Sequence, residues 1–142
     1  MTTLNLNGRW TGVIVFGNRY RQLQGKNLYF DLEITQDNNK ITGTSIDTGG
    51  QGASPDPANI KGTIDDNFIS FIKQYSSYHY YDLNGQVIVD RTRLGPEIFY
   101  TGLYNETENE FSGDWKLIHK LKLFGITLFK LSATGLWTMK RK

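Results

Sequence analysis

The sequence contains no cysteine and only three prolines. Without cysteine, a disulfide framework, a zinc–thiolate site and a thiol nucleophile are all excluded, and the absence is typical of a reducing compartment. No apolar run approaches the about 18 residues of a membrane-spanning helix. The first residues, MTTLNLNG, also lack the basic segment and apolar core of a secretory signal. We therefore expect a cytoplasmic protein with no membrane partner.

The chain also lacks a strong charge of either sign, since its formal net charge is +2. This value is too small to indicate a nucleic-acid partner. The positive charge is uneven, because residues 116–142 carry several lysines and Arg141 but no acidic residue. We do not expect that segment to expose the interleaved aromatic side chains of a single-strand binding surface. We interpret its lysines as the solvated face of β-strands and expect no nucleic-acid partner.

Helix signals are nearly absent, whereas glycine, threonine, isoleucine and aromatic residues are frequent. Residues 28–35 alternate between apolar and mostly polar side chains, and Asp37-Asn38-Asn39-Lys40 then provides a turn before a returning strand at 41–47. Similar segments follow to the end of the chain, including a strand at 123–131 and a terminal strand at 135–141. About nine or ten short strands with tight turns predict an antiparallel meander in a single domain, 1–142. Residues 49–57, GGQGASPDP, form the clearest loop.

Each of the three tryptophans stands two places after a glycine, and further glycines follow the same phase within predicted strands. Because side chains in a strand alternate with period two, these glycines share the apolar face. Glycine weakens a strand interior, so its repetition there needs a reason. A sheet that closes on itself must bend sharply, and glycine permits the bend because it has no side chain on the concave face. Bulky side chains can then fill the space that the missing side chains leave. The pattern predicts a closed barrel, and it involves Gly8 with Trp10, Gly113 with Trp115, Gly135 with Trp137, and Gly43, Gly62 and Gly102.

An early Gly8-x-Trp10, a meander of short strands and a terminal strand with Trp137 and Arg141 resemble the calycin superfamily of lipocalins, avidins and fatty-acid-binding proteins. The resemblance implies a small up-and-down barrel of about eight to ten strands. It also implies that Trp10 closes one end and that Arg141 packs across it. The chain departs from lipocalins in having no cysteine and no evident terminal helix. It departs from avidins at Gly12, Ile14 and Phe16, where those proteins place small and polar contacts for biotin, so we expect no biotin binding.

The richest candidate for ligand binding is the segment 75–81, Tyr-Ser-Ser-Tyr-His-Tyr-Tyr. Aromatic rings with polar tips suit binding sites. Alternation separates Tyr75, Ser77 and His79 from Tyr78 and Tyr80, and the pattern leaves open which set points inward. Arg91 is expected near these tyrosines across the hairpin, and His119 falls in the same strand phase as Trp115. The predicted ligand-binding residues are Tyr75, Tyr78, Tyr80, Arg91, Trp115 and His119. Cross-strand packing of tyrosines is the alternative interpretation.

No catalytic or metal-binding pattern accompanies these residues. His119 lacks an adjacent acid or nucleophile, so it is either a polar anchor inside the barrel, a haem ligand, or a histidine bonded to backbone or water. We therefore expect no enzyme activity and no cofactor. The favoured hypothesis is non-catalytic binding of a small, partly apolar or planar ligand inside the barrel. The alternative is a protein-interaction or structural barrel with a filled interior, and a homo-oligomer is compatible with either.

Overall fold

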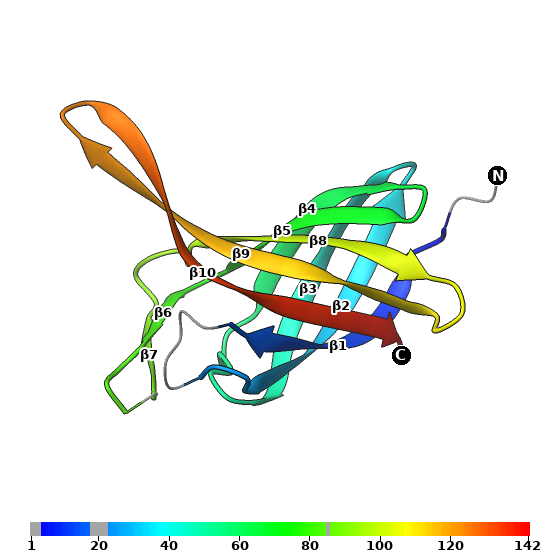
Figure 1. Ribbon diagram of the computed structural model, residues 1–142, viewed down its shortest axis with the longest axis horizontal. Helices are drawn as coiled ribbons and strands as arrows, with labels where there is room; N and C mark the ends of the chain where they lie inside the picture. The colour runs from blue at the N-terminus through cyan, green and yellow to red at the C-terminus, as the bar shows by residue number, and fades with distance from the viewer. Residues whose placement is uncertain (1–3, 18–22, 85) are drawn as a thin grey trace.

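The computed structural model describes residues 4–17, 23–84 and 86–142, without the side chains of residues 81, 119–122, 130 and 132. Every regular element in this part of the chain is a β-strand (Figure 1). The strands are β1 (Gly8–Phe16), β2 (Asn27–Asp37), β3 (Lys40–Gly50), β4 (Ala58–Asp65), β5 (Phe68–Tyr75), β6 (Tyr78–Tyr81), β7 (Val87–Asp90), β8 (Glu97–Asn105), β9 (Glu110–Leu123) and β10 (Ile126–Arg141).

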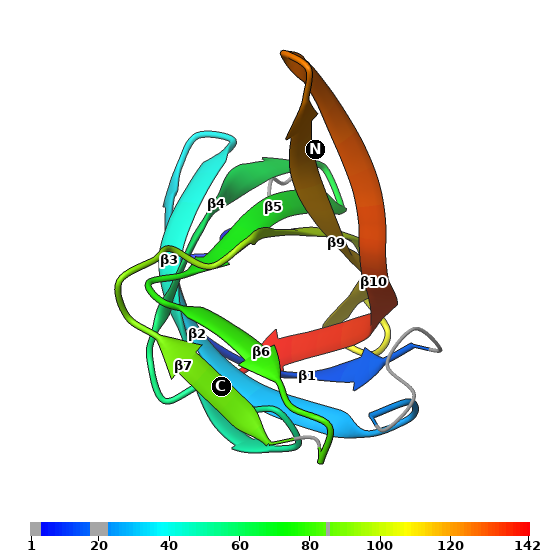
Figure 2. The ribbon, with the colours of Figure 1, turned by 90° about the vertical axis from the view of Figure 1, so that its left-hand side faces the viewer.

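Eight of the strands form a closed antiparallel barrel in the order β1-β10-β9-β8-β5-β4-β3-β2. The barrel closes where β1 meets β10, with Trp10 opposite Arg141 and Ile14 opposite Trp137. Strands β6 and β7 pair with each other as a separate hairpin between β5 and β8, and Figure 2 shows this hairpin across one end of the barrel. The predicted all-β meander, closed into a small barrel of about eight to ten strands, is confirmed.

The recurrent glycines allow tryptophan rings to lie against neighbouring strands. A Cβ atom on Gly135 would stand 2.5 Å from the Trp115 indole nitrogen, and one on Gly102 would stand 2.7 Å from a ring carbon of Trp137. Any larger residue at either position would displace an indole from the core. The Gly-x-Trp spacing therefore reflects large side chains seated on glycines of adjacent strands, which is how a narrow barrel fills its interior.

One end of the barrel is plugged by Trp10. Its indole N–H donates a 2.9 Å hydrogen bond to the Leu6 carbonyl, and its ring meets Phe111 edge to face at 5.6 Å. The Arg141 guanidinium lies 4.6 Å from the centre of the Trp10 ring and donates to backbone carbonyls of the N-terminal segment. This cation–π contact ties the two termini of the described chain together at this closed end.

Trp137 does not lie beside Trp10 at the closed end of the barrel. It lies opposite Ile14, further along β1 from Trp10. Its ring packs edge to face against the stacked Phe71 and Tyr100 rings, each with its centre 5.6 Å away, and its N–H is shared by the carbonyls of Thr101 and Asp114. Trp137 therefore fills the middle of the barrel.

Strands β9 and β10 continue beyond their neighbours as a projecting two-stranded arm (Figure 1). Strand β8 pairs with β9 only as far as Leu117, and β1 pairs with β10 only as far as Gly135. Residues 118–131, which we call the arm, pair only with each other among the described residues and turn at Phe124 and Gly125. The single strand predicted at 123–131 is therefore divided between β9 and β10. Positive backbone φ angles at both turn residues place the reversal there.

Candidate functional site

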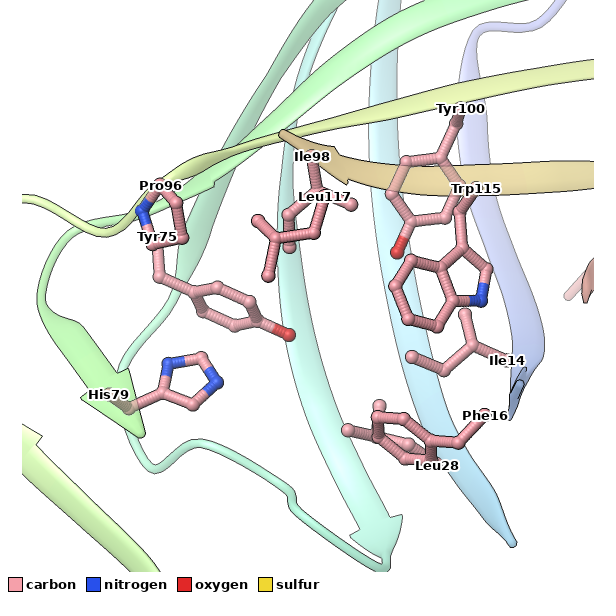
Figure 3. Close-up of a pocket in the computed structure, with 10 residues that line it drawn as sticks. All are labelled: Ile14, Phe16, Leu28, Tyr75, His79, Pro96, Ile98, Tyr100, Trp115 and Leu117. Atoms are coloured by element: carbon pink, nitrogen blue, oxygen red, sulfur yellow. The ribbon is translucent and has the colours of Figure 1, made fainter. Parts of the chain in front are cut away.

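A small apolar cavity lies at the end of the barrel opposite the Trp10 plug (Figure 3). Its volume is about 50 Å³. This exceeds the roughly 10–15 Å³ that one water molecule requires and falls well short of the about 300 Å³ of a typical drug-sized site. Strands β1, β2, β5, β8 and β9 and the β6–β7 hairpin supply the walls. The lining residues are Ile14, Phe16, Leu28, Tyr75, His79, Pro96, Ile98, Tyr100, Trp115 and Leu117.

The β6–β7 hairpin brings His79 to this cavity. Figure 3 shows the imidazole beside the Tyr75 ring, and their ring centres lie 4.6 Å apart in an edge-to-face arrangement. Asp56 anchors the hairpin, because it accepts a 2.7 Å hydrogen bond from the Ser77 hydroxyl and pairs with Arg91 at 3.1 Å. The same hydrogen bond, with help from Arg91, lowers the pKa of Asp56. The carboxylate therefore stays ionised at neutral pH and holds the hairpin over the barrel end.

A buried ion pair lies behind the tyrosines of the cavity wall. The Lys73 ammonium is 3.6 Å from the Asp47 carboxylate, and the two side chains are 3% and 0% exposed. Asp47 also accepts hydrogen bonds from the Tyr75 hydroxyl, at 2.8 and 2.9 Å to its two oxygens, and from the Ser54 backbone N–H at 2.8 Å. Since an unpaired charge would be costly in such a place, these contacts are what allow a carboxylate inside the barrel.

Aromatic rings surround the Lys73 ammonium. It lies 4.9 Å from the centre of the Tyr75 ring and 5.9 Å from that of Tyr100. Both of these rings also line the cavity, so they separate the cation from the cavity by one layer of side chain. Burial lowers the pKa of Lys73, and the Asp47 carboxylate opposes that effect. The buried Lys73–Asp47 ion pair therefore lies directly behind the cavity wall without entering the cavity.

His79 adds a titratable group to the cavity wall itself. Burial lowers the pKa of His79 below its ordinary value of 6.5, while the charge of Asp47 acts in the opposite direction. The imidazole is therefore neutral at pH 7 and presents one donor and one acceptor nitrogen. Together with the apolar walls, it suits a ligand that combines an apolar body with one polar end.

The structure brings only part of the predicted site together. Tyr75 and Trp115 line the same cavity, whereas Tyr78 and Tyr80 lie on the other face of the hairpin. Tyr78 stacks under the Arg93 guanidinium at 4.3 Å, and Tyr80 is 48% exposed. The period of two in β6 decides this, because His79 points inward and its neighbours Tyr78 and Tyr80 point the other way.

Two further predicted residues do not contribute to the cavity as described. Arg91 turns away from it, because its guanidinium pairs with Asp56 and is mostly exposed. His119 has its backbone in β9, opposite Lys130, but its side chain lies outside the described residues. The site residues on β9 that the structure does define are Trp115 and Leu117.

Sequence reasoning missed the ion pair behind the cavity. The signal was nevertheless present, because Lys73 follows Phe71 and precedes Tyr75 in the inward phase of β5. Asp47 likewise stands two places after Ser45, which is buried on β3. A lysine and an aspartate at interior positions of two predicted strands indicate a buried pair.

Comparison with known proteins adds no relative. No protein-family model matches the chain, and neither a curated protein nor a solved structure matches it. Among the described residues, no group of histidine and acidic side chains is arranged to hold a metal ion. The same residues include no helix of the length and apolar character needed to cross a bilayer. The function of the protein therefore has to be inferred from the geometry of the barrel end.

Proposed function

We propose that the protein binds a small, partly apolar ligand, without catalysis, at the open end of the barrel. The observation that carries the proposal is an apolar cavity of about 50 Å³ whose wall includes His79 and Tyr75 and adjoins the buried Lys73–Asp47 pair. Cavities with apolar walls and a few placed polar groups are the usual form of small-molecule sites. The resemblance to the calycin superfamily, whose barrels hold ligands at this place, supports the same function.

The packing below the cavity limits the depth and size of the ligand. Phe71, Tyr100 and Trp137 fill the middle of the barrel, and the Tyr100 and Phe71 rings stack 4.7 Å apart. A ligand would therefore occupy the mouth alone. A larger one would require displacement of the β6–β7 hairpin, which pairs with no barrel strand and is held through Asp56. We propose a compact apolar body with a carboxylate or hydroxyl directed toward His79.

Binding is favoured over catalysis because the reactive groups are already engaged. The Tyr75 hydroxyl and the Asp47 carboxylate bond to each other, and Lys73 is paired with the same carboxylate behind the rings. His79 supplies a base to the cavity wall, but catalysis would also require a nucleophile beside it, and the Tyr75 hydroxyl is already bonded to Asp47. The geometry instead provides an apolar shape, a neutral imidazole and a buried ion pair behind the wall.

Isothermal titration calorimetry with short-chain carboxylic acids and the matching alcohols tests this function. The wild-type protein should bind one molecule per chain, and Leu117→Phe should abolish binding because the larger ring fills the cavity that Leu117 lines. Leu103→Phe is the matched control, since Leu103 is exposed on the outer face of β8. Absence of binding to the wild-type protein, or equal binding by Leu117→Phe, would favour a barrel with a filled interior instead.

A further inference from the structure

The arm exposes more apolar surface than a free hairpin tolerates. Six of its large apolar side chains are between 37% and 99% exposed, with Phe124 at the tip the most exposed: Leu123, Phe124, Ile126, Leu128, Phe129 and Leu131. Together they present on the order of 500 Å², taking about 150 Å² or more for one large side chain. This is at the upper end of the apolar patches seen on monomeric proteins. A two-stranded hairpin is also only marginally stable in water by itself, so the arm has the character of a surface that a partner covers.

The apolar side chains change faces along the arm. Leu131 and Phe129 share one face near the barrel, whereas Leu128 and Ile126 share the opposite face near the tip. Two-stranded ribbons twist strongly about their long axis, and Figure 1 shows the two strands of the arm crossing over each other. In a twisted ribbon, residues on opposite faces at the two ends can face the same direction in space. The change of face therefore fits a single partner that lies along the whole arm.

The root of the arm carries an apolar groove that the tip of its own arm does not reach. The groove has a volume of about 390 Å³ and is lined mainly by Tyr78, Leu94, Pro96, Phe99, Ile118 and Phe129. The strands of the arm pair continuously from the root to the turn at Phe124, which holds the tip at the far end. When two arms lie antiparallel about a two-fold axis, each tip meets the root of the other. The protruding tip and the root groove then become reciprocal contacts of a closed, isologous dimer.

Size agrees with this arrangement, and the charge of the groove does not oppose it. The exposed apolar side chains of each arm, on the order of 500 Å², are of the same order as the roughly 800 Å² per partner that a standard protein interface buries. Residues 116–142 contain only basic charges, and the groove lining carries both Glu97 and Arg93, so it adds no net charge against the basic arm. We propose that the partner of the arm is a second copy of this chain, with Phe124 of each copy seated in the root groove of the other beside Leu94.

Engineered cysteines test this geometry directly, because the wild-type chain has none. The double variant Phe124→Cys/Leu94→Cys should form a covalent dimer under mild oxidation, since a disulfide requires Cα atoms about 4.4–6.8 Å apart. Each single variant should remain uncrosslinked, because an antiparallel pair separates the two tips and the two grooves. Crosslinking of Phe124→Cys alone would show tip-to-tip contact and overturn the proposal.

Sedimentation equilibrium adds a readout without cysteines. The wild-type protein should be dimeric at tens of micromolar, Phe124→Asp should be monomeric, and both should retain the same tryptophan fluorescence because all three indoles are buried in the barrel. Leu103→Asp, which places a charge at another exposed apolar position, should stay dimeric. A monomeric wild-type protein contradicts the proposal. Monomers that bind anionic lipid vesicles through Phe124 would assign the arm to a lipid surface instead.

Discussion

Replacing Lys73 by methionine should destabilise the barrel severely, although methionine is apolar and similar in length. The change removes the ammonium that lies 3.6 Å from Asp47 and leaves a carboxylate with 0% exposure inside the barrel. Two hydrogen-bond donors remain for that carboxylate, the Tyr75 hydroxyl and the Ser54 N–H. Breaking a buried pair by removal of one partner costs about 3–5 kcal/mol. We expect the free energy of unfolding of Lys73→Met to fall by that amount.

The second change, Asp47→Asn, distinguishes an electrostatic cost from lost packing. An asparagine still accepts hydrogen bonds from Tyr75 and Ser54, so the double variant Lys73→Met/Asp47→Asn contains no charge at this place. Its stability should return to within about 1–2 kcal/mol of wild type, since a buried pair contributes little net stability over neutral groups. Urea denaturation of the wild type, the two single variants and the double variant provides a double-mutant cycle. If the two single effects simply add, the reasoning about this ion pair is refuted.

Three further changes test other parts of the structure. Trp10→Ala should lower the free energy of unfolding, measured by urea denaturation, by about 3–5 kcal/mol, as for a large buried aromatic residue. Arg141→Ala should lower it distinctly less. Equal denaturation midpoints for wild type and Trp10→Ala would show that the Trp10 plug does not stabilise the barrel. Burial lowers the pKa of His79, so below pH 7 the unfolded chain binds a proton that the folded chain does not. The melting temperature of the wild-type protein should therefore fall as the pH drops from about 7 to 5, and a His79→Phe variant should lose this dependence. A wild-type melting temperature that stays the same between pH 7 and 5 would contradict the prediction. Gly113→Ala should be strongly destabilising in thermal melts, because its Cβ would stand 1.9 Å from the Thr101 carbonyl oxygen, whereas Gly49→Ala, with open space around the new atom, should melt like wild type.

The fold was predictable because it depends on local alternation. Period-two patterns and turn residues define most of the strands, and the glycines at two-residue spacing from Trp115 and Trp137 indicate a sharply bent sheet that closes on itself. The arm was not predictable in the same way. Residues 116–131 alternate as any strand does, and only the ends of the pairing at Leu117 and Gly135 reveal that this segment leaves the barrel.

The site was predictable only where the phase of a strand was unambiguous. Trp115 continues the apolar phase of Phe111 and Gly113 and lines the cavity, whereas Tyr75 follows Lys73 and its phase was left open. In β6 both phases carry polar aromatic residues, so alternation alone leaves open whether His79 or Tyr80 faces inward. The contact between Lys73 and Asp47 joins β5 to β3 across the interior, and no local pattern encodes that distance.

The proposed ligand site is tested most directly by methyl-detected nuclear magnetic resonance during a titration with a short-chain carboxylic acid. The methyl groups of Ile14, Leu28, Ile98 and Leu117 line the cavity, so their signals should shift together and saturate at one ligand per chain. The methyl signal of Ile64, which is buried in the core outside the cavity lining, should not move. Unchanged cavity signals at millimolar ligand, or shifts confined to Leu123, Ile126 and Leu128 of the arm, would contradict a binding site at the open end of the barrel.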